Sequence, residues 1–149
     1  MRNYKFSGNF LYYVRLIKRL QENMLKQAAS SCGLDFPEAD VLLFLRENPG
    51  FDTARDVAVY RGVSKGYVSK AVETLVKEGF LEVRPDKSDR RMQHLIIAEK
   101  AKKAAEALHD AQINFYAAVT AGLSDVELHG MLSAIEKCAA NVQSAVENI

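Results

Sequence analysis

The sequence predicts a mostly helical protein with one small β-hairpin, an α+β class in which helices dominate. Apolar residues recur at helical spacing along several long stretches, and only three prolines and eight glycines interrupt the 149 residues. Residues 80–84 differ because they alternate apolar and polar side chains, and residues 94–97 form a short apolar run after a charged loop. With 48% hydrophobic residues, the chain can bury the core of one domain or of two small packed units.

The composition excludes several classes of protein. No apolar run is long enough to cross a bilayer, and the N-terminal residues lack the apolar stretch of a signal peptide, so we expect a cytoplasmic protein with no membrane partner. Cys32 and Cys138 lie far apart, and the three histidines have no ligand spacing, so we expect no metal and no cofactor. No phosphate loop or GxSxG motif is present, and we therefore expect no enzymatic activity.

The charge distribution is more informative than the formal net charge of +1. Residues 1–31 carry six basic side chains and one acidic, and residues 61–91 carry eight basic and five acidic. Residues 32–60 between them carry two basic and six acidic side chains. Basic blocks of this kind favour contact with a polyanion at two places in the chain.

Three long helices are predicted near the two ends of the chain. Residues 9–29 and 98–121 have apolar residues at helical spacing, and Ser124 to Glu127 is a capping box that opens a last helix ending at about Glu147. Each of these helices has an apolar face that must be covered. We expect them to pack together, both within one copy and between two copies of the chain.

Residues 35–79 predict three shorter helices. Asp35 and Pro37 start the first, which runs to about Arg46 and is followed by an Asn-Pro-Gly stop. Thr53 starts the second, and Gly62 supplies a tight turn before Ser64 caps the third. The third helix has a predicted buried stripe, which consists of Val68, Val72, Leu75 and Val76, and Gly79 ends it.

A short helix, a glycine turn and a second helix with a polar basic face are typical of a helix-turn-helix. The second helix of such a motif enters the major groove of DNA, and residues near its N-terminus face the bases. The residues at these positions are Ser64, Lys65, Gly66, Tyr67, Ser69 and Lys70. An ordinary helical hairpin has the same pattern, so the helices alone leave both interpretations open.

The hairpin that follows favours DNA binding. A helix-turn-helix followed at once by a β-hairpin with a charged tip predicts a winged helix, and arginine inserts readily into a narrow minor groove. Asp89 stands two residues before Arg91, so in an extended loop both side chains lie on one side of the strand. We expect the carboxylate to hold the guanidinium by paired hydrogen bonds. The alternative is a solvated ion pair with no partner.

The stretch from Val63 to Ala101, VSKGYVSKAVETLVKEGFLEVRPDKSDRRMQHLIIAEKA, resembles the MarR family of bacterial and archaeal transcriptional regulators. The family pattern is a Val-Ser-Lys-x-x-Val-Ser helix, then Lys-x-Gly-Leu-Val-x-Arg, then Asp-x-x-Asp-Arg-Arg, and the order of elements matches over nearly the whole chain. The sequence departs from the pattern in three places. Lys87 replaces a frequent proline, the stretch Ile97-Ala98-Glu99-Lys100-Ala101 replaces a frequent Leu-Thr-x-x-Gly, and Tyr67 is large for a position that is usually small or short.

The resemblance implies a homodimeric regulator, expected to be a repressor, bound to double-stranded DNA at a palindrome. Residues 1–34 and 100–149 would form the helical dimerisation region, and residues 35–99 the winged helix-turn-helix domain. Arg91 matches the arginine that family members place in the minor groove, and Asp89 matches its orienting partner. Arg84 and Arg90 are expected to contact phosphates.

The family often binds small anionic aromatic effectors. The candidates to line such a pocket are Phe10, Tyr13 and Arg15, with Tyr4, Phe6 and Tyr12, and the alternative is that these aromatic residues form the dimer core. Whether Cys32 or Cys138 senses oxidants stays open. A different function also stays open, in which a helical dimer binds a protein partner and keeps a relict helix-turn-helix.

Overall fold

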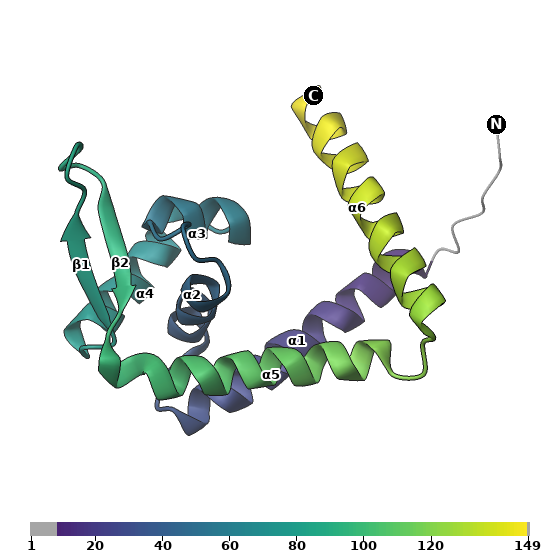
Figure 1. Ribbon diagram of the computed structural model, residues 1–149, viewed down its shortest axis with the longest axis horizontal. Helices are drawn as coiled ribbons and strands as arrows, with labels where there is room; N and C mark the ends of the chain where they lie inside the picture. The colour runs from purple at the N-terminus through teal and green to yellow at the C-terminus, as the bar shows by residue number, and fades with distance from the viewer. Residues whose placement is uncertain (1–8, 149) are drawn as a thin grey trace. The chain divides into compact units, whose positions relative to one another are not determined.

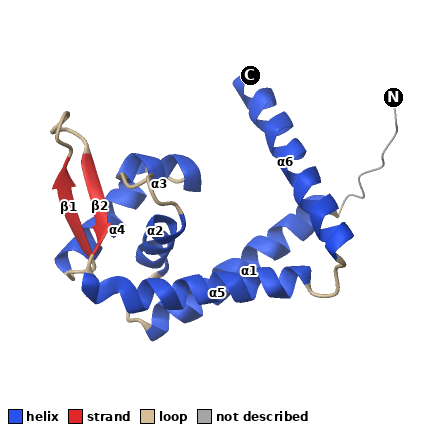
Figure 2. Cartoon of the chain, viewed as in Figure 1, coloured by secondary structure: helices blue, strands red, loops and turns tan. Residues whose placement is uncertain are grey.

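The computed structural model describes residues 9–148, which form six α-helices, one 3₁₀ helix and a two-stranded antiparallel sheet (Figures 1 and 2). The elements are α1 (Phe10–Ser31), α2 (Phe36–Glu47), α3 (Ala54–Arg61), α4 (Lys65–Lys77), β1 (Leu81–Pro85), β2 (Gln93–Ile97), η1 (Glu99–Ala101), α5 (Lys102–Thr120) and α6 (Asp125–Glu147). The expected mostly helical α+β class is confirmed. Tyr4 and Phe6 lie outside the described residues. Within residues 9–148, no helix has the length and apolar character to span a membrane.

The helix ends follow the capping residues in the sequence. The Thr53 hydroxyl accepts a hydrogen bond from the Asp56 N–H at 3.2 Å, and the Asp56 carboxylate accepts one from the Thr53 N–H at 3.0 Å. The Ser64 hydroxyl accepts from the Tyr67 N–H at 3.1 Å and so starts α4. Between α3 and α4, Gly62 has φ +63°, the left-handed conformation that the predicted turn requires.

The chain divides into two compact units, one ending at Phe115 and the other beginning at Tyr116. In the first unit, α2 is the central helix, because Val41 to Leu45 are all buried. Only a helix that is covered on every side buries consecutive residues in this way. The helices α1, α3 and α4 and the sheet all contact this core, so the helix-turn-helix rests on α2.

The buried face of α4 differs in part from the predicted stripe. Val68 and Leu75 are buried as expected, and Ala71 completes the face with 2% exposure. Val72 is half-buried, and Val76 is 40% exposed, so the prediction that Val76 is buried was wrong. Val76 lies about 100° around the helix from Leu75, which turns it out of the face defined by Val68, Ala71 and Leu75.

The sheet pairs β1 with β2 in antiparallel register, from Leu81 opposite Ile97 to Pro85 opposite Gln93. The first strand begins one residue later than expected, and its burial does not alternate, because Leu81 is buried and the next four residues are exposed. A sheet of two strands that reaches beyond the core has little to cover its outer end. A backbone hydrogen bond also joins β2 to the loop before α3, because the Leu95 N–H donates to the Asp52 carbonyl at 2.7 Å.

The long helices α5 and α6 differ in how much they bury. In the first unit, α5 buries Leu108 and Gln112, and the Gln112 side-chain oxygen accepts a hydrogen bond from the Gln21 amide at 3.1 Å. In the second unit, α6 buries no residue. Large apolar side chains along α6 are exposed by half or more, namely Leu132, Ile135, Val142 and Val146.

Candidate nucleic-acid interface

The N-terminal half of α4 presents the polar surface that the sequence predicts. Lys65, Ser69 and Lys70 are exposed, and so are the capping Ser64 and Gly66. The apolar side of the same helix is fixed in the core by Val68 and Leu75. The outward side chains are therefore carried on a rigid support.

Tyr67 is placed differently from its neighbours on α4. The ring is half-buried and packs against the core. Burial raises the pKa of the Tyr67 phenol, and the negative charge of Asp40 adds to the shift. Sequence reasoning grouped Tyr67 with the outward residues, but much of its ring faces the protein.

The tip of the hairpin is organised by Asp86. One carboxylate oxygen, Oδ1, accepts hydrogen bonds from the Ser88 N–H at 2.7 Å, the Ser88 hydroxyl at 2.6 Å and the Asp89 N–H at 2.8 Å. The Asp86 N–H donates to the Met92 carbonyl at 2.9 Å and closes the loop. The hydrogen bond with His94, followed by those from Ser88 and Asp89, holds the pKa of the Asp86 carboxyl well below its usual range. Asp86 is the first aspartate of the Asp-x-x-Asp-Arg-Arg pattern, but the pattern predicts no role for its side chain.

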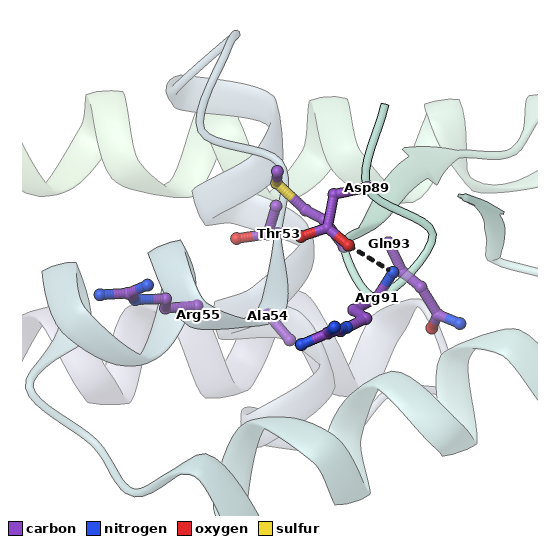
Figure 3. Close-up of a pocket in the computed structure, with 7 residues that line it drawn as sticks. Thr53, Ala54, Arg55, Asp89, Arg91 and Gln93 are labelled. Atoms are coloured by element: carbon purple, nitrogen blue, oxygen red, sulfur yellow. Dashed lines mark hydrogen bonds between the residues drawn. The ribbon is translucent and has the colours of Figure 1, made fainter. Parts of the chain in front are cut away.

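Asp89 contacts Arg91, but not through the guanidinium as predicted. The Asp89 carboxylate accepts a hydrogen bond from the backbone N–H of Arg91 at 3.0 Å, and the Arg91 side chain runs away from this carboxylate (Figure 3). The physical reason is the backbone, since residues 89–92 form a turn closed by the Met92 N–H on the Asp89 carbonyl at 2.9 Å. In a turn, a short acidic side chain caps a nearby N–H. The prediction of an extended loop, in which Asp89 pairs with the Arg91 guanidinium, was wrong.

A shallow open hollow lies between the start of α3 and the hairpin (Figure 3). Its lining includes Thr53 and Arg55 from the start of α3 and Asp89, Arg91 and Gln93 from the hairpin. Arg55 is exposed, and sequence reasoning missed it. Arg55 lies within residues 32–60, where acidic side chains outnumber basic ones, so the charge distribution did not indicate a basic residue close to the hairpin.

His94 is the second functional candidate that the sequence did not suggest. Its Nδ1 lies 2.7 Å from an Asp52 carboxylate oxygen, and its Nε2 lies 3.0 Å from Oδ2 of Asp86. The hydrogen bond with Asp86, followed by that with Asp52, raises the pKa of the His94 imidazole. Asp52 is far from His94 in the sequence, so no local motif could reveal the contact. Among the described residues, no cluster of His, Cys, Asp and Glu is arranged to hold a metal ion.

The remaining predicted site residues are exposed. Arg84 lies 3.2 Å from the Glu82 carboxylate on the same strand, and Arg90 lies in the turn at the tip of the hairpin. On α1, Phe10 and Tyr13 are each about half exposed. Arg15 is exposed too, but lies about 200° around the helix from Tyr13, so α1 does not bring these three residues to one face.

Together, α3, α4 and the hairpin define a winged helix-turn-helix protein. Residues 33–92 match the family model described as the MarR family. A curated relative, the HTH-type transcriptional regulator BilQ of Clostridium symbiosum, is 23% identical over 128 residues, which cover 86% of this chain and 88% of BilQ. Over residues 33–92 the chain is therefore similar to the MarR family of transcriptional regulators, and the similarity to BilQ extends over most of its length.

Several solved structures share the fold of this chain. A MarR-family regulator of Listeria monocytogenes, in complex with a 26mer DNA, superposes with a TM-score of 0.81 at 17% identity, covering 91% of this chain and 90% of that one. CouR of Rhodococcus jostii, bound to p-coumaroyl-CoA, superposes with a TM-score of 0.74 at 18% identity, covering 89% of this chain and 93% of that one.

Proposed function

We propose that the protein is a sequence-specific regulator that binds double-stranded DNA. The observation that carries the proposal is that one rigid lobe displays two exposed basic elements, the start of α4 and the tip of the hairpin. The start of α4 would enter the major groove, where Lys65, Ser69 and Lys70 meet the bases and Ser64 and Gly66 approach the backbone. Tyr67 would contribute its exposed edge.

The hairpin would act as a wing in the flanking minor groove. Arg91 would enter the groove, while Arg84 and Arg90 would contact phosphates and Asp89 would fix the turn that carries Arg91. Arg55, beside the same hollow, would add a further phosphate contact. The Listeria monocytogenes regulator, which has the same fold, is complexed with a 26mer DNA, and this supports DNA binding by the lobe.

We further propose that two copies form a homodimer through residues 1–34 and 100–149, with residues 35–99 as the DNA-binding domain. The support is α6, a helix of 23 residues that buries none of them in the single chain. A row of exposed apolar side chains along a whole helix marks an interaction surface. A two-fold dimer would place its half-sites about 10 base pairs apart, centre to centre, on a palindromic operator.

The proposed mode of action is repression that a small aromatic or anionic effector relieves. Any ligand that prefers a dimer with a different spacing of its two α4 helices weakens binding to the operator. CouR binds an aromatic thioester, p-coumaroyl-CoA, and has the same fold. Phe10, Tyr13 and Arg15 are candidates for such a site. Because Tyr13 and Arg15 lie on opposite sides of α1, the site would have to combine them through the second copy of the chain.

The test is selection of bound duplexes from a randomised pool, with wild type, Arg91→Glu and Lys65→Glu. The control is Lys103→Glu, which reverses an exposed basic charge on α5, a helix with no proposed DNA contact. We expect wild type and the control to enrich one palindrome, and the other two variants to lose it. Binding without any enriched sequence would contradict the proposed specificity.

The rival function is a scaffold that binds a protein partner and keeps a relict helix-turn-helix. A scaffold of this kind would bind no duplex at low salt, and its partner binding would be indifferent to charge reversal at Arg91. The same selection therefore separates the two functions. The proposed DNA binding also predicts that affinity falls steeply with salt, because basic side chains displace counterions from phosphates.

A further inference from the structure

We propose that His94 is a positioning residue of the wing, which clamps the tip of the hairpin to the start of the helix-turn-helix by bridging Asp52 and Asp86. The inference rests on the proposed function of the wing in DNA binding. The three side chains come from separate places, with Asp52 in the loop before α3, Asp86 at the tip of the hairpin and His94 on β2.

The chemistry of the bridge fixes the charge of the imidazole. An ionised carboxylate can only accept hydrogen bonds, so each ring nitrogen of His94 must carry a proton to bond one. With Asp52 at 2.7 Å on one side and Asp86 at 3.0 Å on the other, both nitrogens donate and the ring is an imidazolium. A positive ring between two carboxylates makes two charge-assisted hydrogen bonds.

Asp86 connects the His94 bridge to the turn that carries Arg90 and Arg91. Its Oδ2 accepts from His94, while its Oδ1 accepts from the Ser88 N–H and hydroxyl and from the Asp89 N–H. Asp89 in turn accepts from the Arg91 N–H at 3.0 Å. An unbroken chain of hydrogen bonds therefore runs from the His94 ring to the backbone of Arg91.

Asp52 anchors the other end of the bridge. Its carbonyl accepts a hydrogen bond from the Leu95 N–H at 2.7 Å, and the next residue, Thr53, is the N-cap of α3. The bridge thus ties the wing to the beginning of the helix-turn-helix itself. This fixes the position of Arg91 relative to Arg55, which lines the same hollow.

The hairpin needs an anchor of this kind because its apolar contacts stop early. Leu81 and Leu95 are buried, but Arg84, Pro85 and Gln93 farther along the strands are exposed. The charged groups that act on the ring are Asp86 and Asp52. Arg84 is opposite His94 in the register, and its guanidinium lies 3.2 Å from the Glu82 carboxylate.

The test compares His94→Gln with Asp86→Asn, using His109→Gln as the matched control. His109 pairs with Glu47 between α5 and α2, so the control removes another histidine–carboxylate contact of the same lobe. Amide hydrogen exchange is measured without DNA. We expect His94→Gln and Asp86→Asn to accelerate exchange across residues 86–92 and to leave α2 and α4 unchanged, while the control leaves the wing protected. In Asp86→Asn, the His94 ring should titrate at a lower pH than in wild type when followed by NMR.

The functional arm is a double-variant cycle on the DNA enriched by wild type. If the clamp acts by placing Arg91, His94→Gln lowers the affinity by about the same factor as Arg91→Ala, and the double variant falls no further. Unchanged wing exchange in both clamp variants, or full additivity with Arg91→Ala, would overturn the inference. Should wild type bind no duplex while the clamp variants still loosen the wing, the clamp is supported and the proposed function fails.

Discussion

The helix α4 and the hairpin, the proposed wing, are two basic elements of one lobe that are held in different ways. α4 places Val68, Ala71 and Leu75 in the apolar core, each 2% exposed or less. The wing buries Leu81 and Leu95 there, with Ile97 packed against the core at its base, and fixes its tip through hydrogen bonds among Asp52, His94 and Asp86. One element is held by apolar burial, the other by polar contacts near water.

This difference predicts that the two elements respond to different perturbations. Apolar burial is non-directional and depends little on pH, so α4 should keep its position for as long as the lobe is folded. Exposed charge-assisted contacts depend on pH and are screened by salt. The wing should therefore change its order under conditions that leave α4 in place.

The largest expected effect comes from removing the apolar anchor of α4. Leu75→Ala should lower the free energy of unfolding by about 2–5 kcal/mol, because it leaves a cavity at a fully buried position. Val76→Ala, one residue further and 40% exposed, is the matched control and should cost well under half as much. Chemical denaturation followed by circular dichroism measures both. Equal losses would contradict the buried face assigned to α4.

A smaller effect is expected at the start of α4. Ser64→Ala removes the oxygen that accepts from the Tyr67 N–H at 3.1 Å, and should lower the free energy of unfolding by about 1 kcal/mol. Ser69→Ala, on the exposed face of the same helix, should change it by less than about 0.5 kcal/mol. The same denaturation experiment decides this. If Ser69→Ala proved the more damaging, the capping role of Ser64 would be wrong.

The next prediction separates the sequence-based and structural roles of Asp89. Asp89→Ala removes the acceptor for the Arg91 N–H and should weaken DNA binding by about 2- to 10-fold, the usual worth of one hydrogen bond. Asp89→Asn keeps an oxygen that can accept from the same N–H, so it should bind much like wild type. Fluorescence anisotropy with a labelled operator measures both variants. If Asn were as damaging as Ala, the carboxylate charge would matter, as guanidinium pairing requires.

How much the sequence could predict depends on the range of the contacts. Helix caps and tight turns depend on contacts between residues three or four positions apart. The structure confirms those predicted at Thr53, Gly62, Ser64 and the Ser124–Glu127 capping box. The order of elements follows from such local signals. The bridge of His94 joins residues 42 positions apart, and no periodicity or motif reports it.

The error at Asp89 has a related cause. The spacing of Asp89 and Arg91 was correctly read as a contact, but the prediction assumed an extended backbone. Asp86, three residues earlier, bends the loop by accepting from Ser88 and Asp89, and this changes which atom of Arg91 the Asp89 carboxylate meets. The conformation of residues 89–92 thus depends on Asp86, and Asp86 is itself held by His94 on β2.

The smallest expected effect is a dependence of wing order on pH. The pKa of His94 is raised, so its contribution is complete below the ordinary histidine pKa of 6.5 and is lost as the pH rises through the raised value. The pKa of Asp86 is lowered from 3.8, so its contribution holds above 3.8 and is lost only in stronger acid. Between these limits the wing should be ordered, and on the alkaline side it should loosen while α4 does not.

The change should be small because the His94 side chain is 31% exposed and water screens its charge. Hydrogen exchange, corrected for the intrinsic effect of pH on amides, should show falling protection in residues 86–92 on the alkaline side and constant protection in α4. In His94→Gln, the wing should be equally loose at every pH above the ordinary aspartate pKa of 3.8. If protection of the wing and of α4 fell together in wild type, the two elements would share one anchor, and the contrast between apolar and polar attachment would be wrong.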